Sequence, residues 1–442
     1  MTINVADQPG HALSHAAAEA YIASTCFKTG PPGRVGVEIE HLVHDILDPH
    51  APVRADRLDQ LMANTVLPAG GMLTREPGGQ IELSTLPLDN AESAVVAGTT
   101  DLDELHRTAG NAGLLLLGEG TDPLRSPRRT LDHPRYAAME SYLDQWGLAG
   151  RQMMCSTASV QITVDGGQSD QQIADRWNLV HSLGPTLVAM FANSPFVAGR
   201  ATGWKSTRQA IWWSIDPART APAQTATPCR TATQASEMYA RYALNAPVMV
   251  IQKNQRDWSA PRGLTFSDWI GGLHRIPELR SPTAGDLAYH LTTLFPPVRA
   301  RGAFEVRYID SQPDNDWIVP TVVLSSLLNN PEATDFASEA VEPVAAAWER
   351  AARFGLDDPE LAQAARRCME LALGSVDAVD ATPTIATTVR AFADRHTERN
   401  RCPADDRLDR GPSPVQKTIA AQSHQDASVI SVADQVARET KR

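Results

Sequence analysis

The chain has 442 residues, of which 42% are hydrophobic, and it carries a formal net charge of −12. This length and apolar content allow one large core or two coupled ones, and the acidic balance argues against general nucleic-acid binding, which depends on clustered Lys and Arg. No apolar run approaches the roughly 18 residues of a membrane span, and Asp7, His11, His15 and Glu19 interrupt the region where a secretory signal would need a continuous apolar stretch. We therefore expect a cytoplasmic globular protein without nucleic-acid or membrane partners.

The cysteines support this location. There are five, an odd number, and no two form a CxxC pair. This pattern favours reduced thiols over a disulfide framework or a structural zinc site. The residues concerned are Cys26, Cys155, Cys229, Cys368 and Cys402.

The first half of the chain is expected to mix strands and helices without βαβ regularity. Residues 1–29 are interpreted as a lead-in followed by a helix at 15–27, which the Gly-Pro-Pro-Gly sequence at 30–33 ends. The elements expected next are a strand at 34–43, a helix at 57–64, a hairpin at 71–83, a helix at 92–111, a short buried segment at 114–117, a basic loop at 121–135 and a helix at 136–146.

The second half is expected to become helical towards its end. The elements expected in order are a strand at 153–165, a buried helix at 170–192, a long loop at 193–207, a mobile Ala/Thr/Pro-rich segment at 221–233, a helix that turns into a strand at Pro247 within 239–251, a strand at 303–309, and helices over 317–393. Residues 401–442 are interpreted as a polar tail. The remaining chain, 30–400, is expected to form one domain with a helical part from about 317.

Polar side chains recur two residues apart in strand-like sequence, which places them on one face of a strand. The positions are Glu38 and Glu40, Gln80 and Glu82, Gln161, and Glu305 and Arg307. If these faces converge, they predict a multi-metal phosphate site. Taken singly, each acidic pair also fits the solvent face of an amphipathic strand, and Glu305 with Arg307 fits a structural ion pair.

The segment REPGGQIELS is more specific. Gly78 and Gly79 allow a tight turn or a close approach of backbone to ligand, although Gly-Gly is also common in ordinary hairpins. Glu76 and Glu82 flank the turn. Such hard oxygen ligands favour Mg²⁺, with Mn²⁺ as the alternative, and Mg²⁺ commonly shares its remaining positions with substrate phosphates. The segment therefore indicates a nucleotide.

Standard motifs of other enzyme classes are missing. His41 is out of phase with the preceding glutamates, so His41 and His44 make a poor zinc pair. The stretch at 199–206 resembles a P-loop by eye but has the wrong spacing between its glycines and lysine. Without GxGxxG, GxSxG or HExxH, a Rossmann enzyme, a serine hydrolase with a nucleophile elbow and a zincin all lack their main sequence support.

Eight segments between about 34 and 320 follow one another in the order of a known family. They read VGVEIE, EPGGQIELS, RYAAME, MMCSTASVQITVD, MFANSP, STRQAIWWSID, YALNAPVMVI and HLTTLFPPVRARGAFEVRYIDSQP. In this order the sequence resembles the plant-type and actinobacterial glutamate-cysteine ligases, most of all those of the ergothioneine pathway. Eight segments in the family order make chance similarity a poor explanation.

The resemblance implies an α+β fold. A curved, largely antiparallel sheet would form a funnel-shaped active site with helices packed outside, as in the catalytic domain of glutamine synthetase. It also implies ATP-dependent ligation of the side-chain carboxylate of L-glutamate to L-cysteine through γ-glutamyl phosphate, giving γ-glutamylcysteine for ergothioneine biosynthesis.

The resemblance assigns roles to particular residues. Two or three Mg²⁺ ions would be bound by Glu38, Glu40, Glu76, Glu82, Gln161 and Glu305. Arg307 would contact ATP and stabilise the transferred phosphoryl group, acting with Glu305 as a catalytic residue. The substrate-binding residues would be Arg135, Tyr136, Thr157 and Arg208. Since exposed arginines often only pair with acids, a surface ion pair is the alternative for Arg135 and Arg208.

The loops at 193–207 and 221–233 are expected to act as lids, because an acyl phosphate must be kept from water. Two other functions stay open. One is a phosphotransferase or a carboxylate-amine ligase for a different amine, since related catalytic domains share the metal-carboxylate arrangement. The other is a catalytically silent nucleotide- or amino-acid-binding module. The sequence does not indicate the oligomeric state.

Overall fold

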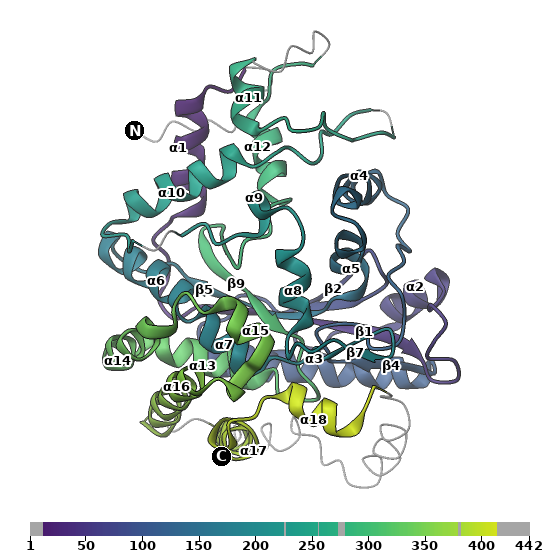
Figure 1. The fold of residues 1–442 in the computed structure, drawn as a ribbon, viewed down its shortest axis with the longest axis vertical. Coiled ribbons are helices and arrows are strands. Elements are labelled where there is room, and N and C mark those ends of the chain that lie inside the picture. Colours follow the sequence, from purple (N-terminus) through teal and green to yellow (C-terminus); the bar gives the residue numbers. More distant parts are fainter. Residues whose placement is uncertain (1–11, 225–226, 255, 273–278, 379–381, 413–442) are drawn as a thin grey trace.

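An antiparallel sheet lies at the centre of the structure, a computed structural model that describes residues 12–224, 227–254, 256–272, 279–378 and 382–412 (Figure 1). Its strand order is β2-β3-β1-β5-β9-β8, and β4 pairs with the far end of β1. The strands of this sheet are β1 Val35–Asp45, β2 Met72–Arg75, β3 Ile81–Ser84, β4 Leu114–Leu117, β5 Ser159–Asp165, β8 Val298–Ala300 and β9 Ala303–Asp310. A separate small hairpin consists of β6 Phe196–Val197 and β7 Arg200–Ala201.

Helices make up most of the remaining described chain. Their bounds are α1 His15–Cys26, α2 Ala55–Asn64, α3 Ala91–Asn111, α4 Pro134–Leu143, α5 Leu148–Ser156, α6 Asp170–Ser182, α7 Gly184–Phe191, α8 Thr207–Trp213, α9 Pro217–Thr220, α10 Ala232–Asn245, α11 Phe266–Gly271, α12 Ala284–Leu291, α13 Ile318–Asn329, α14 Pro331–Val341, α15 Trp348–Phe354, α16 Pro359–Ala378, α17 Pro383–Arg395 and α18 Pro403–Arg410. Several begin where a Ser, Thr or Asn side chain accepts a first-turn N–H, as Ser206 does for α8.

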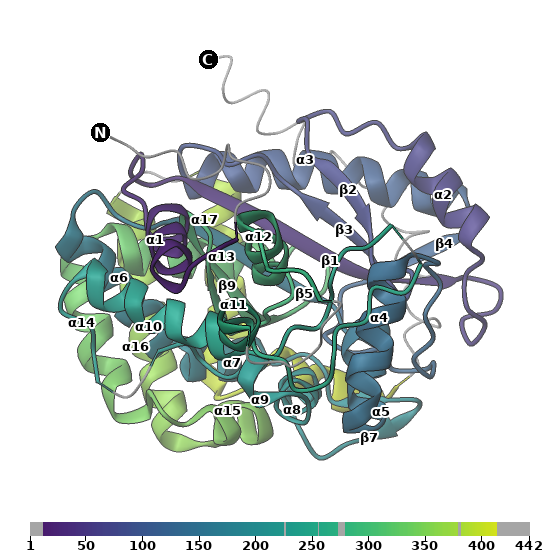
Figure 2. The ribbon, with the colours of Figure 1, turned by 90° about the horizontal axis from the view of Figure 1, so that it is seen from above.

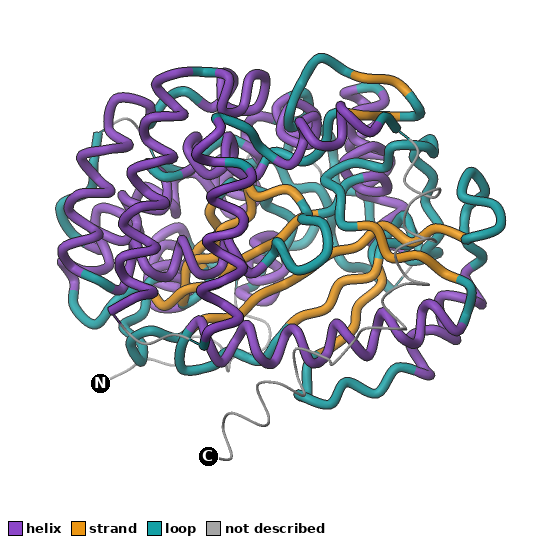
Figure 3. The backbone as a smooth tube through the Cα atoms, turned by 90° about the horizontal axis from the view of Figure 1, so that it is seen from below, coloured by secondary structure: helices purple, strands orange, loops and turns teal. Residues whose placement is uncertain are grey.

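The strand alternation divides the sheet into an apolar and a polar face. In β1, Val35, Val37 and Ile39 are buried, while Glu38 and Glu40 point to the other side. Contacts of α3 with β1 and of α7 with β9 cover the sheet, and α13 and α16 pack behind them. Figure 1 shows α3 along the lower side of the sheet and α4, α5 and α8 above it, and Figures 2 and 3 show the same layers from above and below. The core therefore lies on the apolar face, and the polar face is left for a site.

The expected α+β class with an antiparallel sheet is confirmed. The amino-terminal helix, the strand with the acidic pair, the hairpin, the strand at 303–309 and the helices after 317 all lie close to their expected ranges. The funnel shape and the division of the chain into domains stay predictions. No helix within the described residues is long and apolar enough to cross a membrane.

Three expected elements differ in the structure. The segment from Met153 belongs to helix α5, and β5 starts only at Ser159, because Met153 and Met154 are buried in an apolar cluster with α4 and α8 side chains. The helix expected at 170–192 is split into α6 and α7, since Pro185 cannot donate a backbone hydrogen bond to a continuous helix. The strand expected after Pro247 is absent from the described residues, which show only isolated bridges from Pro247 and Val250.

Three further differences concern segments expected to be irregular. The loop expected at 193–207 contains the short β6–β7 hairpin. Helix α10 begins at Ala232, inside the Ala/Thr/Pro-rich segment, of which residues 225–226 lie outside the described residues. The polar tail expected from 401 is wrong for its first part, because α18 is a capped helix preceded by the fully buried Cys402. Residues 1–11 of the lead-in and 413–442 of the tail lie outside the described residues.

Candidate active site

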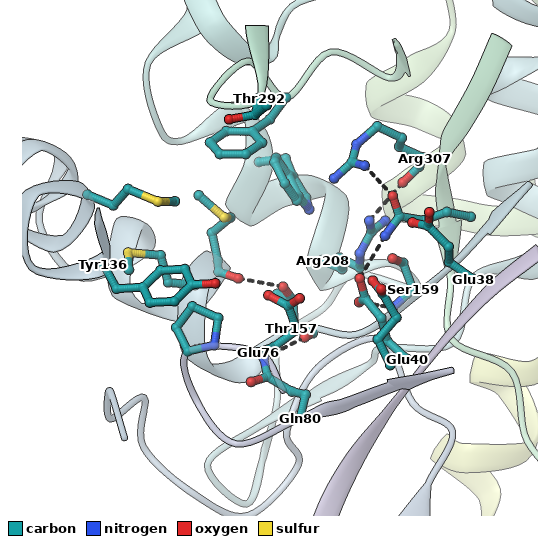
Figure 4. Close-up of a pocket in the computed structure, with 18 of the residues that line it drawn as sticks. Glu38, Glu40, Glu76, Gln80, Tyr136, Thr157, Ser159, Arg208, Thr292 and Arg307 are labelled. Atoms are coloured by element: carbon teal, nitrogen blue, oxygen red, sulfur yellow. Dashed lines mark hydrogen bonds between the residues drawn. The ribbon is translucent and has the colours of Figure 1, made fainter. Parts of the chain in front are cut away.

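A cavity of about 220 Å³ opens on the polar face of the sheet (Figure 4). It is smaller than the roughly 300–1,000 Å³ of many small-molecule sites. Acidic, cationic and apolar side chains line different parts of it. The lining residues are Glu38, Glu40, Glu76, Pro77, Gln80, Glu82, Arg135, Tyr136, Met139, Met153, Met154, Thr157, Ser159, Gln161, Arg208, Trp212, Thr292, Phe295, Arg299 and Arg307.

The sheet register brings the acidic pairs together. Glu38 of β1 lies directly opposite Gln161 of β5, and Glu40 lies opposite Glu82 of β3. Directly opposed residues of antiparallel strands point to the same face. The motifs that are separated in sequence by 40 to 120 positions therefore share one surface, as the spacing predicted.

A bulge in β9 brings polar side chains of this strand onto the same surface. Val160 pairs with Ile309 but Ile162 pairs with Val306, so Arg307 and Tyr308 together face the single residue Gln161. The extra residue re-aims the strand. As a result Asp310, at an odd spacing from Arg307, still lies opposite Ser159 on the polar face.

Gln161 connects the acidic and basic parts of the site. Its Nε2 donates to Glu40 Oε1 at 2.7 Å, and its Oε1 accepts a hydrogen bond from Arg307. The other oxygen of Glu40 accepts from the Ser159 N–H at 2.7 Å. Both ends of the Gln161 amide are thus used by protein partners, which does not support its predicted role as a metal ligand.

Glu305 lies beneath the cavity, with an exposed fraction of 0%, and is not among the lining residues. Arg307 and Arg299 both pair with its Oε1, Arg299 at 3.1 Å, and Arg301 Nε lies 3.2 Å from its Oε2. Although burial alone raises the pKa of Glu305, the charges of these three arginines lower it to about 2. In this arrangement Glu305 is the counter-ion of an arginine cluster.

The four other carboxylates lie close enough to repel one another. They belong to Glu38, Glu40, Glu76 and Glu82. Burial and then the charges of Glu305 and Glu82 raise the pKa of Glu38 to about 7. Burial and the charges of Glu82 and Glu40 raise that of Glu76 to about 8, and burial likewise raises the pKa of Glu40 and Glu82. An added cation would relieve this repulsion.

The donor set fits a hard divalent cation. Within the described residues, the carboxylate of Glu76 makes no hydrogen bond or ion pair that would compete with a metal ion. The carboxylate of Glu82 accepts hydrogen bonds from Thr74 at 2.9 Å and from Ser84 at 3.1 Å. No group of three His, Cys, Asp or Glu side chains in the described part of the chain is already close enough to hold a metal ion. Ligation would therefore require these carboxylates to move closer together.

Four buried guanidinium nitrogens across the cavity have no hydrogen-bond partner within the described residues. They are the Nε atoms of Arg208, Arg299 and Arg307, together with Nη1 of Arg208. Arg208 is 2% exposed, lies 5.5 Å from the ring centre of Trp212, and is anchored by a 2.7 Å hydrogen bond from Nη2 to the Arg307 carbonyl. Unpaired buried donors of this kind favour an anionic ligand such as a carboxylate or phosphate.

The other predicted substrate residues also line the cavity. Tyr136 comes from α4 and Thr157 from the end of α5, where its carbonyl accepts from Gln80 Nε2 at 2.8 Å. Arg135 lies at the rim, where both terminal nitrogens donate to Thr292 at 3.0 Å. The surface ion pair considered for Arg135 and Arg208 does not describe either residue: Arg135 binds a threonine, and the nearest acid to Arg208 is the buried Asp310 at 3.9 Å.

Gly78 explains why the hairpin loop can sit against α5. A Cβ atom at this position would lie 2.1 Å from the Cys155 carbonyl oxygen, which is far too close. Gly79 has a φ of +95°, a conformation that favours glycine. The Gly-Gly pair therefore makes the tight approach that brings Glu76 and Gln80 to the cavity.

Some lining residues were not predicted. Arg299 could have been found, because it alternates with Arg301 and its strand position lies opposite Glu305 in the β8–β9 hairpin. Trp212 follows Arg208 by one helical turn in α8. Met139, Phe295 and Thr292 carry no sequence signal that separates them from core or loop residues. The predicted lid loops at 193–207 and 221–233 contribute no described side chain to the cavity wall, and their role stays a prediction.

Comparison with known proteins places this site in a family. The cavity on the antiparallel sheet is lined by carboxylates and arginines, side chains that suit a divalent cation and an anionic ligand. The model of glutamate-cysteine ligase family 2 (GCS2) matches residues 34–435. The chain therefore belongs to glutamate-cysteine ligase family 2.

Individual relatives agree. The chain is 42% identical over 405 residues to the glutamate-cysteine ligase EgtA of Mycobacterium tuberculosis, covering 90% of each chain. It is 42% identical to EgtA of Mycolicibacterium smegmatis, covering 89% of this chain and 90% of the relative. A chloroplastic glutamate-cysteine ligase of Brassica juncea is 30% identical, covering 66% of this chain and 60% of that protein.

A solved structure shares the fold. It is a glutamate-cysteine ligase (gshA) from Francisella tularensis in complex with AMP, with a TM-score of 0.53 and 13% identity, covering 94% of this chain and 95% of that chain. At this identity the likeness concerns the fold alone.

Proposed function

We propose that the protein catalyses the ATP-dependent ligation of the side-chain carboxylate of L-glutamate to the amine of L-cysteine, giving γ-glutamylcysteine. The observation that carries this proposal is one cavity with buried carboxylates on one wall and unpaired guanidinium donors on the other. Family membership and the 42% identity to EgtA ligases support it. The same identity supports a place for the product in ergothioneine biosynthesis.

The acidic wall is the proposed metal-binding part. Glu38, Glu40, Glu76 and Glu82 would hold two or three Mg²⁺ ions, with Mn²⁺ as the alternative, and bound Mg²⁺ supplies positive charge that neutralises the phosphates of ATP. The sequence-based ligand set also contained Gln161 and Glu305. Their contacts with Arg307 favour a different role, which is to hold this arginine in place.

The basic wall is the proposed phosphoryl- and carboxylate-binding part. Arg307 and Arg299 would stabilise negative charge on the phosphoryl group as it moves to the glutamate side chain, since both have an unpaired Nε–H. Arg208, more deeply buried, would bind a substrate carboxylate, because its planar fork matches that group. Thr157, Tyr136 and Arg135 would bind substrate at the mouth.

The cavity would then protect the γ-glutamyl phosphate. The cysteine amine attacks its carbonyl carbon, the bond to phosphate breaks, and phosphate leaves. Water must be excluded during this step because acyl phosphates hydrolyse. The apolar part of the wall, formed by Met139, Met153, Met154, Trp212 and Phe295, supplies a surface that does not hold water.

The size of the cavity limits what it holds at once. A volume of about 220 Å³ fits an amino acid with phosphate groups beside it, and the rest of a nucleotide would extend through the mouth. The partners proposed are small molecules. A cytoplasmic location is proposed on the basis of the five free, buried cysteines.

An ADP-release assay tests the function. Glutamate is fixed, a panel of amines is varied, and Mg²⁺ is omitted in a control. The proposal expects release that needs Mg²⁺ and glutamate and is fastest with cysteine, together with γ-glutamylcysteine as the product. Equal rates with other amines would identify a different carboxylate-amine ligase, and ATP binding without any turnover would identify a silent binding module.

A further inference from the structure

Helix α18 lies behind the site, on the opposite side from the cavity. Figure 1 shows it in yellow at the lower edge of the molecule. The sequence suggested a polar tail here, but three contacts tie this helix to loops that come much earlier in the chain. Arg407 Nη2 lies 2.8 Å from Glu119 Oε1, Lys205 Nζ pairs with Asp405, and the Ala404 N–H donates to the Ala192 carbonyl at 2.9 Å.

The first loop contacted by α18 leads directly to Arg208. Lys205 is only 12% exposed and is held by Asp405 and, at 3.0 Å, by Asp357. The next residue, Ser206, caps α8 through a 3.3 Å hydrogen bond from the Gln209 N–H. Arg208 lies in the first turn of this helix. The position of Lys205 therefore influences where α8 starts and where Arg208 lies.

A buried polar cluster at Asp310 makes this connection stiff. Asp310 accepts hydrogen bonds from Ser206 Oγ at 2.9 Å, from Ser194 Oγ at 2.7 Å and from the Asn193 N–H at 2.9 Å. The Arg208 N–H in turn donates to Ser194 Oγ at 3.1 Å. A displacement of the loop would therefore be transmitted to Arg208.

The second loop contacted by α18 leads to Thr157. Glu119 is 2% exposed and precedes Gly120, whose carbonyl accepts from the Ala158 N–H at 3.1 Å. Thr121 forms a bridge with Thr157. At Gly120 a Cβ atom would lie 2.6 Å from Cγ of Asp310 in β9, and the Gly120 N–H donates to the Asn193 carbonyl at 3.0 Å, so this loop packs closely against both β9 and the first loop.

We propose that α18 is a positioning element of the reaction: its Asp405–Lys205 and Arg407–Glu119 pairs hold the two loops that place Arg208 and Thr157 in the cavity. Neither pair touches the cavity, so none of the four residues is catalytic. The proposal rests on the proposed function, because the consequence of misplacing Arg208 is weaker use of glutamate.

The test compares Asp405→Asn and Lys205→Met with Asp409→Asn. Asp405 and Asp409 lie on the same helix and lose the same charge, but the side chain of Asp409 is 68% exposed and pairs only with Arg401 in the described part of the chain. Asparagine at 405 keeps an oxygen that can accept the Cys402 N–H and so preserves the helix cap. The measurements are kcat/KM for glutamate, the dissociation constant of glutamate, and the melting temperature.

We expect Asp405→Asn and Lys205→Met each to lower kcat/KM for glutamate by about 10- to 100-fold, the cost of a small misplacement of a substrate-holding group. The double variant should lose no more than Lys205→Met alone, because that substitution already removes the pairs of Lys205 with both Asp405 and Asp357. Lys205→Arg, which keeps the charge, should restore most of the activity. Asp409→Asn should behave as the wild type.

Wild-type kinetics in Asp405→Asn and Lys205→Met would overturn the positioning role, and so would losses that add in the double variant or that also occur in Asp409→Asn. If Lys205→Met does not fold, the comparison of Lys205→Arg, Asp405→Asn and Asp409→Asn decides the matter. A wild-type protein without glutamate- and cysteine-dependent ADP release would instead overturn the proposed function.

Discussion

Gln161 donates a 2.7 Å hydrogen bond to Glu40 across strands β5 and β1, while the oxygen of the same amide accepts from Arg307. A side chain with both a donor and an acceptor is needed at this point, because it joins a carboxylate to a guanidinium. The amide thus links the acidic wall of the cavity to the basic one. This contact favours a bridging role for Gln161, whereas the sequence predicted direct metal ligation.

Substitution of Gln161 by glutamate separates these two roles. A carboxylate cannot donate to Glu40 and would repel it, so a bridging Gln161 predicts a lower kcat, by about 10-fold or more from the loss of a charge-assisted hydrogen bond. The half-saturating Mg²⁺ concentration of this variant should not fall below that of the wild type. If Gln161 instead binds the metal directly, the half-saturating Mg²⁺ concentration should fall, since a charged oxygen binds Mg²⁺ better than an amide. ADP release measured over a Mg²⁺ titration decides between them, with Gln161→Leu as the variant that removes both hydrogen bonds.

Glu305→Gln should abolish ADP formation. Because Glu305 is fully buried among three arginines, the substitution also leaves guanidinium charge uncompensated, and we expect the free energy of unfolding to fall by about 3–5 kcal/mol. Urea denaturation and ADP release check the two effects. Arg301→Gln is the matched control, since that side chain is 53% exposed and its loss should change stability little. Normal turnover in folded Glu305→Gln protein would show that the ion cluster around Glu305 is not needed for the reaction.

Arg307→Lys keeps the charge but loses the planar guanidinium, of which one nitrogen, Nη1, donates to both Gln161 and Glu305. If Arg307 stabilises the transferred phosphoryl group, kcat should fall by about 100-fold or more. Steady-state kinetics with ATP and glutamate varied separately measure this. An unchanged kcat would make Arg307 a purely structural residue.

Gly78→Ala should displace the hairpin loop from α5. The added Cβ would meet the Cys155 carbonyl at 2.1 Å, and overpacking of this kind costs about 1–3 kcal/mol of unfolding free energy. Turnover should fall as well, because Glu76 and Gln80 move with the loop. Gly374→Ala in α16, where a Cβ meets nothing within 4 Å, should not lower the melting temperature. Equal melting temperatures for the two variants would contradict this prediction.

The five thiols should be unreactive in the folded protein at pH 8. Burial raises the pKa of Cys26, Cys155 and Cys368 to about 12, and it raises that of Cys229 and Cys402 as well. A pKa raised above the working pH keeps the neutral thiol, and only the thiolate reacts with a disulfide reagent. We expect slow labelling in buffer and rapid labelling of five groups in guanidinium chloride. A native thiol that reacts at once would contradict the buried arrangement.

Much of the architecture could be predicted from local sequence. The alternation in β1 predicted that Glu38 and Glu40 share a face, and the Gly-Gly pair predicted the close approach at 78–79. Helix α5 was missed because a continuous apolar run such as MMC carries no period that separates a strand from a buried helix. Helix α18 was missed because its composition is polar and its contacts with Glu119, Lys205 and Ala192 join it to distant parts of the chain.

The sequence by itself determined which side chains share the polar face of β1 and, through the order of its motifs, to which family the chain is similar. The reason is that side-chain direction in a strand repeats every two residues and needs no partner. Only the tertiary structure decided that Glu305 lies under the cavity among arginines, that Gln161 joins Glu40 to Arg307, and that α18 packs behind Arg208. These relationships join residues more than a hundred positions apart or depend on burial, and local periodicity contains no information on either.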